Sequence, residues 1–170
     1  MKVTKKVASI LVLGAGLAGT ASANHHFNTP DCDKAGEHIN SAILNLDSAK
    51  SSLEGYSYKD RRSGRMSLRK AVADITKAKA SVADCGLLPA YFSVDEFEVQ
   101  LLNPLSVTID LETHMNTGNL TNELGLSAAR LLTVKSLKQS RGSSDDDAIA
   151  EIDVAISILD KVESNISSQM

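Results

Sequence analysis

Two cysteines, each at the outer end of a segment with helical periodicity, constrain the fold of this chain more than any other feature. Apolar residues recur every three or four positions in residues 31–54 and again in residues 63–84, and a glycine follows each segment. Cys32 lies 22 residues before the end of the first segment, and Cys85 lies 22 residues after the start of the second. Two antiparallel helices of this length, each ~33 Å long, bring both cysteines to the same open end. The sequence therefore predicts a helical hairpin closed by a Cys32–Cys85 disulfide.

Both segments carry a stripe of aliphatic residues along one side. The apolar residues are mostly Ala, Leu, Ile and Val, and tryptophan is absent, which suits an aliphatic helical core better than a β-sandwich. The predicted inward-facing residues are Ala35, Ile39, Ala42, Ile43, Leu46, Ala49 and Leu53 in the first segment and Leu68, Ala71, Val72, Ile75, Ala78 and Val82 in the second.

The C-terminal part of the chain predicts a second helical hairpin. Residues 121–139 have helical spacing, and Ser144 followed by three aspartates begins a last helix. The serine side chain can cap free amide groups, and the aspartates favour the positive end of the helix dipole. The predicted inward-facing residues are Leu124, Ala128, Leu131, Val134, Lys135 and Leu137 in the first of these helices and Ala148, Ile149, Ile152, Ala155, Ile156, Leu159, Val162 and Ile166 in the second.

The connection between the hairpins, residues 87–118, fits two interpretations. A capping box that begins at Ser93 and an Asn-Pro pair at 103–104 each favour a short helix. Strict alternation in residues 97–101 and 105–111 instead indicates a β-hairpin. We favour short helices, because an isolated two-stranded hairpin is marginally stable.

Together these segments predict a mainly all-α fold, a disulfide-stapled four-helix bundle of two antiparallel hairpins. The first hairpin comprises residues 31–86 and the second comprises residues 119–168. Both belong to a single helical-bundle domain, residues 31–170, which follows a flexible N-terminal tail at residues 24–30.

The first 23 residues have the organisation of a secretory signal peptide. Three lysines precede an uncharged apolar run, and Ala21-Ser22-Ala23 is an A-x-A cleavage site. Residues 14–19 match the G-x-G-x-x-G of dinucleotide-binding folds, but the residues that follow are too few and too polar for the helix that this motif requires. We therefore expect cleavage after Ala23 and a periplasmic or secreted mature protein.

Charge and cysteine content limit the compartment and the class of partner. Loss of the leader removes three of the 18 basic residues, which leaves 15 basic against 21 acidic residues and a net charge of −6. A chain with this charge is not expected to bind nucleic acid, and no segment after the leader is apolar and long enough to be embedded in a membrane. Two cysteines in an oxidising compartment favour a disulfide.

Cleavage after Ala23 creates a candidate metal site. The mature chain then begins Asn24-His25-His26. A free amine followed by histidine at position three can bind Cu(II) or Ni(II) through four nitrogen atoms in a square plane. Apart from this segment, the sequence predicts no cofactor.

A basic and aromatic segment between the first two helices is the candidate partner-binding site. Residues 59–79 contain eight basic and two acidic residues within an acidic chain. Arginine and tyrosine together suit phosphates, carboxylates or an acidic protein surface. The candidate residues are Tyr56, Tyr58, Arg61, Arg62, Arg65 and Arg69.

The sequence contains no recognisable catalytic motif, since it lacks a P-loop, an H-E-x-x-H pair and a local Ser-His-Asp signature. We therefore expect a non-enzymatic module that binds another envelope or secreted protein, or an anionic ligand. Two alternatives are a periplasmic Cu(II)- or Ni(II)-binding protein and a hydrolase whose catalytic residues are distant in the sequence.

Overall fold

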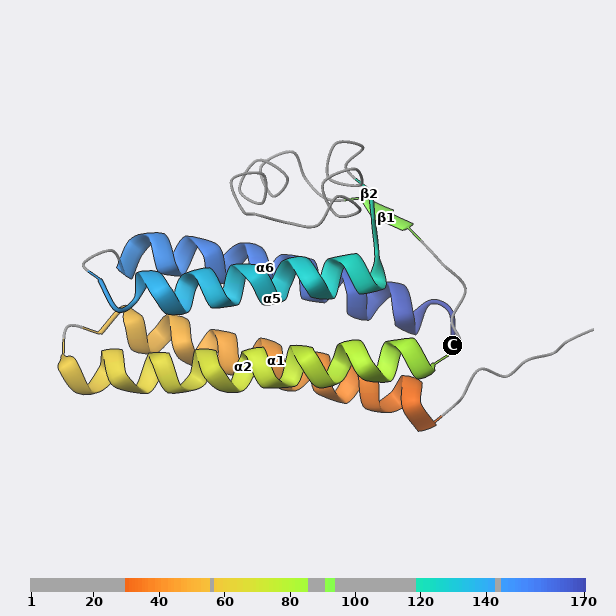
Figure 1. Cartoon of the computed structure of the whole chain (residues 1–170), viewed down its shortest axis with the longest axis horizontal. Coiled ribbons are helices and arrows are strands. Elements are labelled where there is room, and N and C mark those ends of the chain that lie inside the picture. Colours follow the sequence, from red (N-terminus) through yellow and green to blue (C-terminus); the bar gives the residue numbers. More distant parts are fainter. Residues whose placement is uncertain (1–29, 56, 86–90, 94–118, 143–144) are drawn as a thin grey trace, which may run out of the picture.

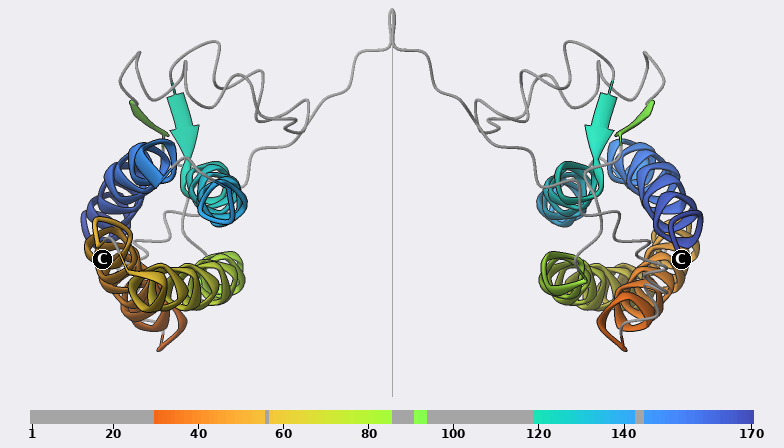
Figure 2. Two further views of the ribbon diagram at one scale, coloured as in Figure 1. Left: turned by 90° about the vertical axis from the view of Figure 1, so that its left-hand side faces the viewer. Right: turned by 90° about the vertical axis from the view of Figure 1, so that its right-hand side faces the viewer.

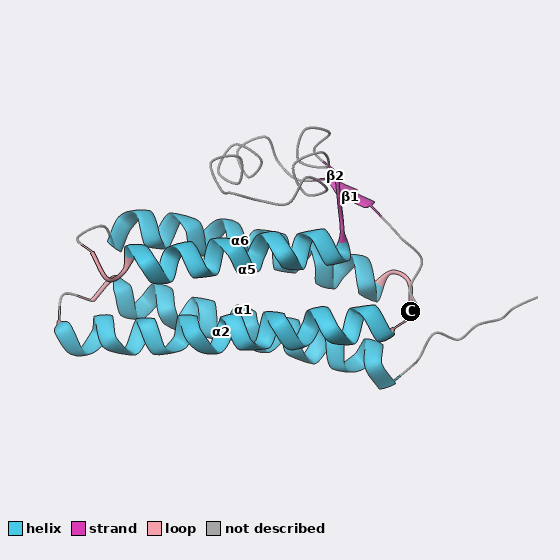
Figure 3. Cartoon of the chain, in the orientation of Figure 1, coloured by secondary structure: helices cyan, strands magenta, loops and turns pink. Residues whose placement is uncertain are grey.

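The computed structural model of the chain describes residues 30–55, 57–85, 91–93, 119–142 and 145–170. Within these residues the chain forms four long helices and two short strands (Figures 1 and 3). The elements, in chain order, are α1 (Pro30–Leu53), α2 (Tyr58–Asp84), β1 (Tyr91–Ser93), β2 (Asn119–Thr121), α5 (Asn122–Gln139) and α6 (Asp145–Ser167).

The four helices pack as two antiparallel hairpins around a shared core. Helix α1 packs along α2, and α5 packs along α6. The hairpins contact each other where α2 meets α5 and where α1 meets α6. Seen along the helices, the four ribbons surround one central region (Figure 2). This arrangement confirms the predicted all-α, disulfide-stapled four-helix bundle.

The aliphatic stripes of α1, α2 and α6 form the core in the predicted way. All of their predicted inward-facing residues are buried except Ile43, Val72, Ile149 and Ile156, which are partly buried. Burial of each larger aliphatic side chain stabilises the folded state by about 1.5–3 kcal/mol. The pairing of the helices therefore follows directly from the spacing of apolar residues.

The predicted inward face of α5 is only partly right, because Ala128 is buried but the larger predicted residues are not fully so. Leu124, Leu131 and Leu137 are only partly buried and pack at the edge of the core. The buried face of α5 includes Thr133 and Ser136, whose hydroxyls donate to backbone oxygens of Ala129 and Ala148 at 2.8 and 2.9 Å. Hydroxyls that are satisfied in this way can be buried, so a prediction from apolar spacing alone places the face incorrectly.

Lys135 of α5 forms a partly buried ion pair across the second hairpin. Its partner, Glu151 of α6, is 4% exposed. A buried carboxylate requires a cationic or hydrogen-bonding partner, because its own desolvation is costly. The pair fixes how α5 faces α6, and it explains why a lysine occupies an inward-facing position.

Helix α2 begins five residues earlier than the expected start at residue 63. The Ser57 hydroxyl oxygen accepts a hydrogen bond from the backbone amide of Asp60 at 3.1 Å, which is an N-cap. Gly64 therefore lies inside the helix, where it is buried against α1. A Cβ atom at position 64 would lie 3.0 Å from Leu53 Cγ and 3.2 Å from the Ala49 carbonyl oxygen, so the glycine permits a close helix contact.

The two ends of the connection pair as a short antiparallel ladder. Tyr91 lies opposite Thr121, and Ser93 lies opposite Asn119. The Thr121 hydroxyl also caps α5 by accepting from the Leu124 amide at 3.3 Å. Sequence patterns do not predict this pairing, because each strand has only three residues. The short helices and the β-hairpin considered for residues 97–111 lie outside the described residues.

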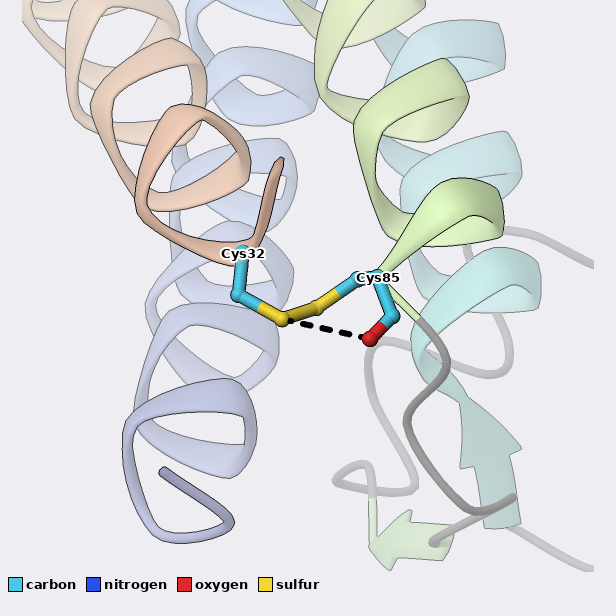
Figure 4. The surroundings of a disulfide bond; sticks show 2 residues. All are labelled: Cys32 and Cys85. Atoms are coloured by element: carbon cyan, nitrogen blue, oxygen red, sulfur yellow. Dashed lines mark hydrogen bonds between the residues drawn. A yellow bond between two sulfur atoms is a disulfide. The ribbon is translucent and has the colours of Figure 1, made fainter. Parts of the chain in front are cut away.

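The disulfide closes the open end of the first hairpin as predicted. Cys32 in the first turn of α1 is bonded to Cys85 at the C-terminal cap of α2, and both residues are buried (Figure 4). Their Cα atoms are 5.0 Å apart, which lies within the usual range for a disulfide. The bond joins residues 53 positions apart, and it therefore links the start of α1 to the end of α2.

The two helical glycines offer a matched test of close packing. Gly36 of α1 has open space where a Cβ would be placed, whereas Gly64 does not. We expect Gly36→Ala to raise the free energy of unfolding by up to about 1 kcal/mol through helix propensity. Gly64→Ala should lower it by about 1–3 kcal/mol through overpacking. Guanidinium denaturation of both variants measures this, and equal stabilisation by the two would contradict the described contact.

The disulfide gives a second stability prediction. Replacing both cysteines by alanine should lower the free energy of unfolding by about 4 kcal/mol, because the unfolded chain loses a constraint on a loop of this length. Thermal and denaturant unfolding of the variant provides the measurement. Reduction of the unmodified protein should give a loss of similar size, and an unchanged midpoint in both cases would show that the bond contributes nothing.

Candidate functional site

The described residues include five of the six predicted partner-binding residues. Tyr58, Arg61, Arg62, Arg65 and Arg69 all lie in the N-terminal half of α2, at the end of the bundle opposite the disulfide. Tyr56 lies outside the described residues. The predicted metal site at residues 24–26 also lies outside them, so it stays a prediction.

Arg61 is partly exposed, but its guanidinium group is engaged within the bundle. Its Nη2 atom lies 2.8 Å from Oδ2 of Asp145, whose side chain is 14% exposed. Asp145 is the first residue of α6, so this ion pair joins the first hairpin to the second. The partial burial of both groups makes the pair stronger than one between fully solvated charges.

Arg65 makes a second connection between the hairpins. Its Nη1 atom donates to the backbone oxygen of Ser140 at 3.1 Å. Ser140 is the C-terminal cap of α5, where carbonyl oxygens lack partners within the helix. Arg61 and Arg65 therefore join the two hairpins, and of the described candidate residues Tyr58, Arg62 and Arg69 make no such contact between hairpins.

A pocket of about 410 Å³ lies beside the Arg61–Asp145 pair. Its polar lining is supplied by that pair together with Glu54 and Asp146, and its apolar lining includes Leu53 and Ile149. The pocket contains one cation and three carboxylates, and the cation already pairs with one of the carboxylates. The hydrolase alternative is not tested by this arrangement and stays a prediction.

The remaining basic residues form an exposed row on the outer side of α2. Tyr58, Arg62, Met66 and Arg69 follow one another at spacings of three or four residues, and Tyr58 and Met66 are 76% and 47% exposed. Exposed Lys59 and Lys70 flank the row. We refer to Tyr58, Lys59, Arg62, Met66, Arg69 and Lys70 as the α2 basic stripe.

The cations of the α2 basic stripe have few internal partners. The ion pairs among the described residues do not include Lys59, Arg62 or Lys70. Arg69 Nη1 lies 3.7 Å from Met66 Sδ, which is a weak contact. Met66 is not among the residues predicted from the sequence, although its position between two arginines at helical spacing is a signal for it.

The position of these cations opposes the dipole of α2. Lys59 and Arg62 lie in the first two turns, where the free amide groups make the helix end positive, and the last turn contains no basic residue. Cations placed in this way weaken the isolated helix. Stability of α2 therefore does not account for the charge pattern, and local rules are most often broken in this way at functional surfaces.

On the other side of the bundle, carboxylates are crowded between α1 and α6. Burial, followed by the nearby carboxylates of Asp47 and Glu163, raises the pKa of Asp160 above its usual value. Lys50 donates to Asp153 at 2.7 Å, and this hydrogen bond raises the pKa of the lysine. The bundle therefore has a basic side and an acidic side.

Comparison with known proteins returns no match from family models, curated sequences or solved structures. None of the described helices combines the length and hydropathy that crossing a membrane would require. Within the described ranges, no three His, Cys, Asp or Glu side chains are grouped in a way that could hold a metal ion.

Two neighbouring arginines test which residues join the hairpins and which only face the solvent. Arg61→Ala should lower the free energy of unfolding by about 1–3 kcal/mol, because it leaves the largely buried Asp145 carboxylate without its cation. Arg62→Ala should change it by less than about 0.5 kcal/mol, because Arg62 is exposed. Urea denaturation of both variants measures the difference, and equal losses would contradict the assignment.

Proposed function

We propose that this protein is an exported, non-enzymatic binding module that docks an acidic segment of a partner protein on the α2 basic stripe. Residues 1–23 act as a cleaved signal peptide, and the mature protein works in the periplasm or outside the cell. The Cys32–Cys85 disulfide supports this location, because such bonds persist in oxidising compartments.

The observation that carries the proposal is a row of exposed cations interleaved with exposed apolar side chains. Arg62 and Arg69 flank Met66, and Tyr58 extends the row by one turn. Arginine and exposed aromatic side chains are enriched at protein interfaces, where the apolar groups supply contact area and the charges supply orientation. The charge pattern is also unfavourable for the helix itself, as described above.

The shape of the α2 basic stripe favours an extended protein segment over a small anion. Arg62 and Arg69 are seven residues apart, which corresponds to about 10 Å along the helix. An acidic helix or strand can lie along both guanidinium groups and along the apolar side chain between them, whereas a single phosphate or carboxylate offers no group to contact that side chain. Nucleic acid is a poor alternative, because the mature chain is acidic and the cations are separated by apolar residues.

A direct test uses a poly-glutamate peptide as the probe and fluorescence anisotropy as the measurement. The variant Arg62→Glu/Arg69→Glu should bind the peptide at least about tenfold more weakly than the unmodified protein. The control variant Lys138→Glu/Arg141→Glu makes the same charge change at exposed positions outside the stripe and should lose much less affinity. Circular dichroism should show that both variants keep their helices, since all four positions are exposed.

Two results would contradict the proposal. One is unchanged peptide binding by Arg62→Glu/Arg69→Glu, which would place the contact elsewhere. The other is an equal loss in both variants, which would show general attraction between opposite charges rather than a defined surface.

A further inference from the structure

The charges of the helices are divided between two opposite sides of the bundle. Helices α2 and α5 together contain eleven basic and four acidic residues, whereas α1 and α6 contain three basic and eleven acidic residues. Because α2 lies next to α5 and α1 lies next to α6, one side has a net charge of +7 and the other of −8 (Figure 2). The overall net charge hides this separation.

The acidic side gathers carboxylates from α1 and α6. Asp33, Glu37 and Glu163 line one groove, and Glu163 and Asp47 both interact with the carboxylate of Asp160. None of these five residues takes part in an ion pair between described residues. Burial and then repulsion from Asp47 and Glu163 raise the pKa of Asp160, and a cation supplied from outside would relieve that repulsion.

The outer row of α1 has the same organisation as the α2 basic stripe, with the opposite charge. Leu44 is 69% exposed and lies between Glu37 and Asp47 on one line of the helix surface. Met66 lies between Arg62 and Arg69 in the corresponding way. Each helix thus offers an exposed apolar side chain flanked by charges, and the two rows are complementary in charge.

The register of the first hairpin places the opposite charges at matching levels. Ser48 contacts Ser67, Ser41 donates to Asp74 and Cys32 is bonded to Cys85. Because α1 and α2 are antiparallel, moving one residue toward the C-terminus of α1 corresponds to moving one residue toward the N-terminus of α2. Asp47 is therefore level with Arg69, and Glu54, which directly follows α1 and extends its outer row, is level with Arg62, to within about one residue.

A second copy placed beside the first in the same orientation preserves these levels. Helix α1 of one copy then runs antiparallel to α2 of its neighbour, and Asp47 faces Arg69 while Glu54 faces Arg62. We propose that the acidic partner of the α2 basic stripe is the outer row of α1 in a second copy of this chain. This inference rests on the proposed function and identifies the partner class.

The contact uses different surfaces on the two copies, so it repeats. Each copy keeps a free acidic row at one side and a free basic stripe at the other, and such a heterologous contact generates chains of copies rather than a closed pair. The association depends on exposed charges, so it weakens as the ionic strength rises.

Sedimentation velocity of the mature protein tests the inference. In about 20 mM salt, the average mass should increase with protein concentration beyond that of two copies, and about 500 mM salt should return the protein to single copies. Arg62→Glu/Arg69→Glu makes both rows acidic, and Asp47→Lys/Glu54→Lys makes both rows basic. Each variant alone should remain a single copy, whereas an equimolar mixture should associate again.

The outcomes separate this inference from the proposed function. A mixture that does not associate, or an unmodified protein that stays a single copy in low salt, overturns self-association. If poly-glutamate still binds to the α2 basic stripe in that case, the proposed function stands and only the identity of the partner is wrong. A mixture that stops at two copies would contradict the repeating contact.

The control variant Lys138→Glu/Arg141→Glu should associate like the unmodified protein.

Discussion

The register of α1 against α2 is the constraint on which the rest of the structure depends. It is fixed at one end by the Cys32–Cys85 bond and at the other by the close approach of α1 to Gly64. Between these points, the Asp74 carboxylate accepts hydrogen bonds from Ser41 and Asn45 at 2.8 and 3.0 Å. A bond that limits the unfolded chain and a seam of satisfied polar groups together leave the hairpin one alignment. The levels of every exposed charge on the two helices follow from it.

The second hairpin is held by polar interactions as much as by apolar packing. Lys135 pairs with Glu151, and Ser136 donates to a carbonyl oxygen of the facing helix. Arg61 and Arg65 then fasten this hairpin to the first one at the loop end. Polar groups in such positions have strict geometric requirements, so they specify how helices face one another where aliphatic contacts alone would permit several arrangements.

The division of the basic segment into two groups is central to the functional proposal. The sequence offered one cluster of arginines and tyrosines, but the structure assigns Arg61 and Arg65 to the bundle and leaves Arg62 and Arg69 exposed. Residues four apart lie on one side of a helix, whereas adjacent residues such as Arg61 and Arg62 point in directions about 100° apart. The exposed group lies on the side of the bundle opposite the crowded carboxylates of α1 and α6.

The sequence by itself determined the helical class, the disulfide and the inward faces of α1, α2 and α6, because apolar spacing at a helical period is a local property that packing leaves unchanged. It could not determine the face of α5, whose buried hydroxyls are satisfied only by groups that the fold brings near, such as the Ala148 carbonyl. It also could not reveal the pairing of β1 with β2, or which arginines meet Asp145 and Ser140. Those contacts join residues distant in the chain, and only the tertiary structure decides which side chains become partners.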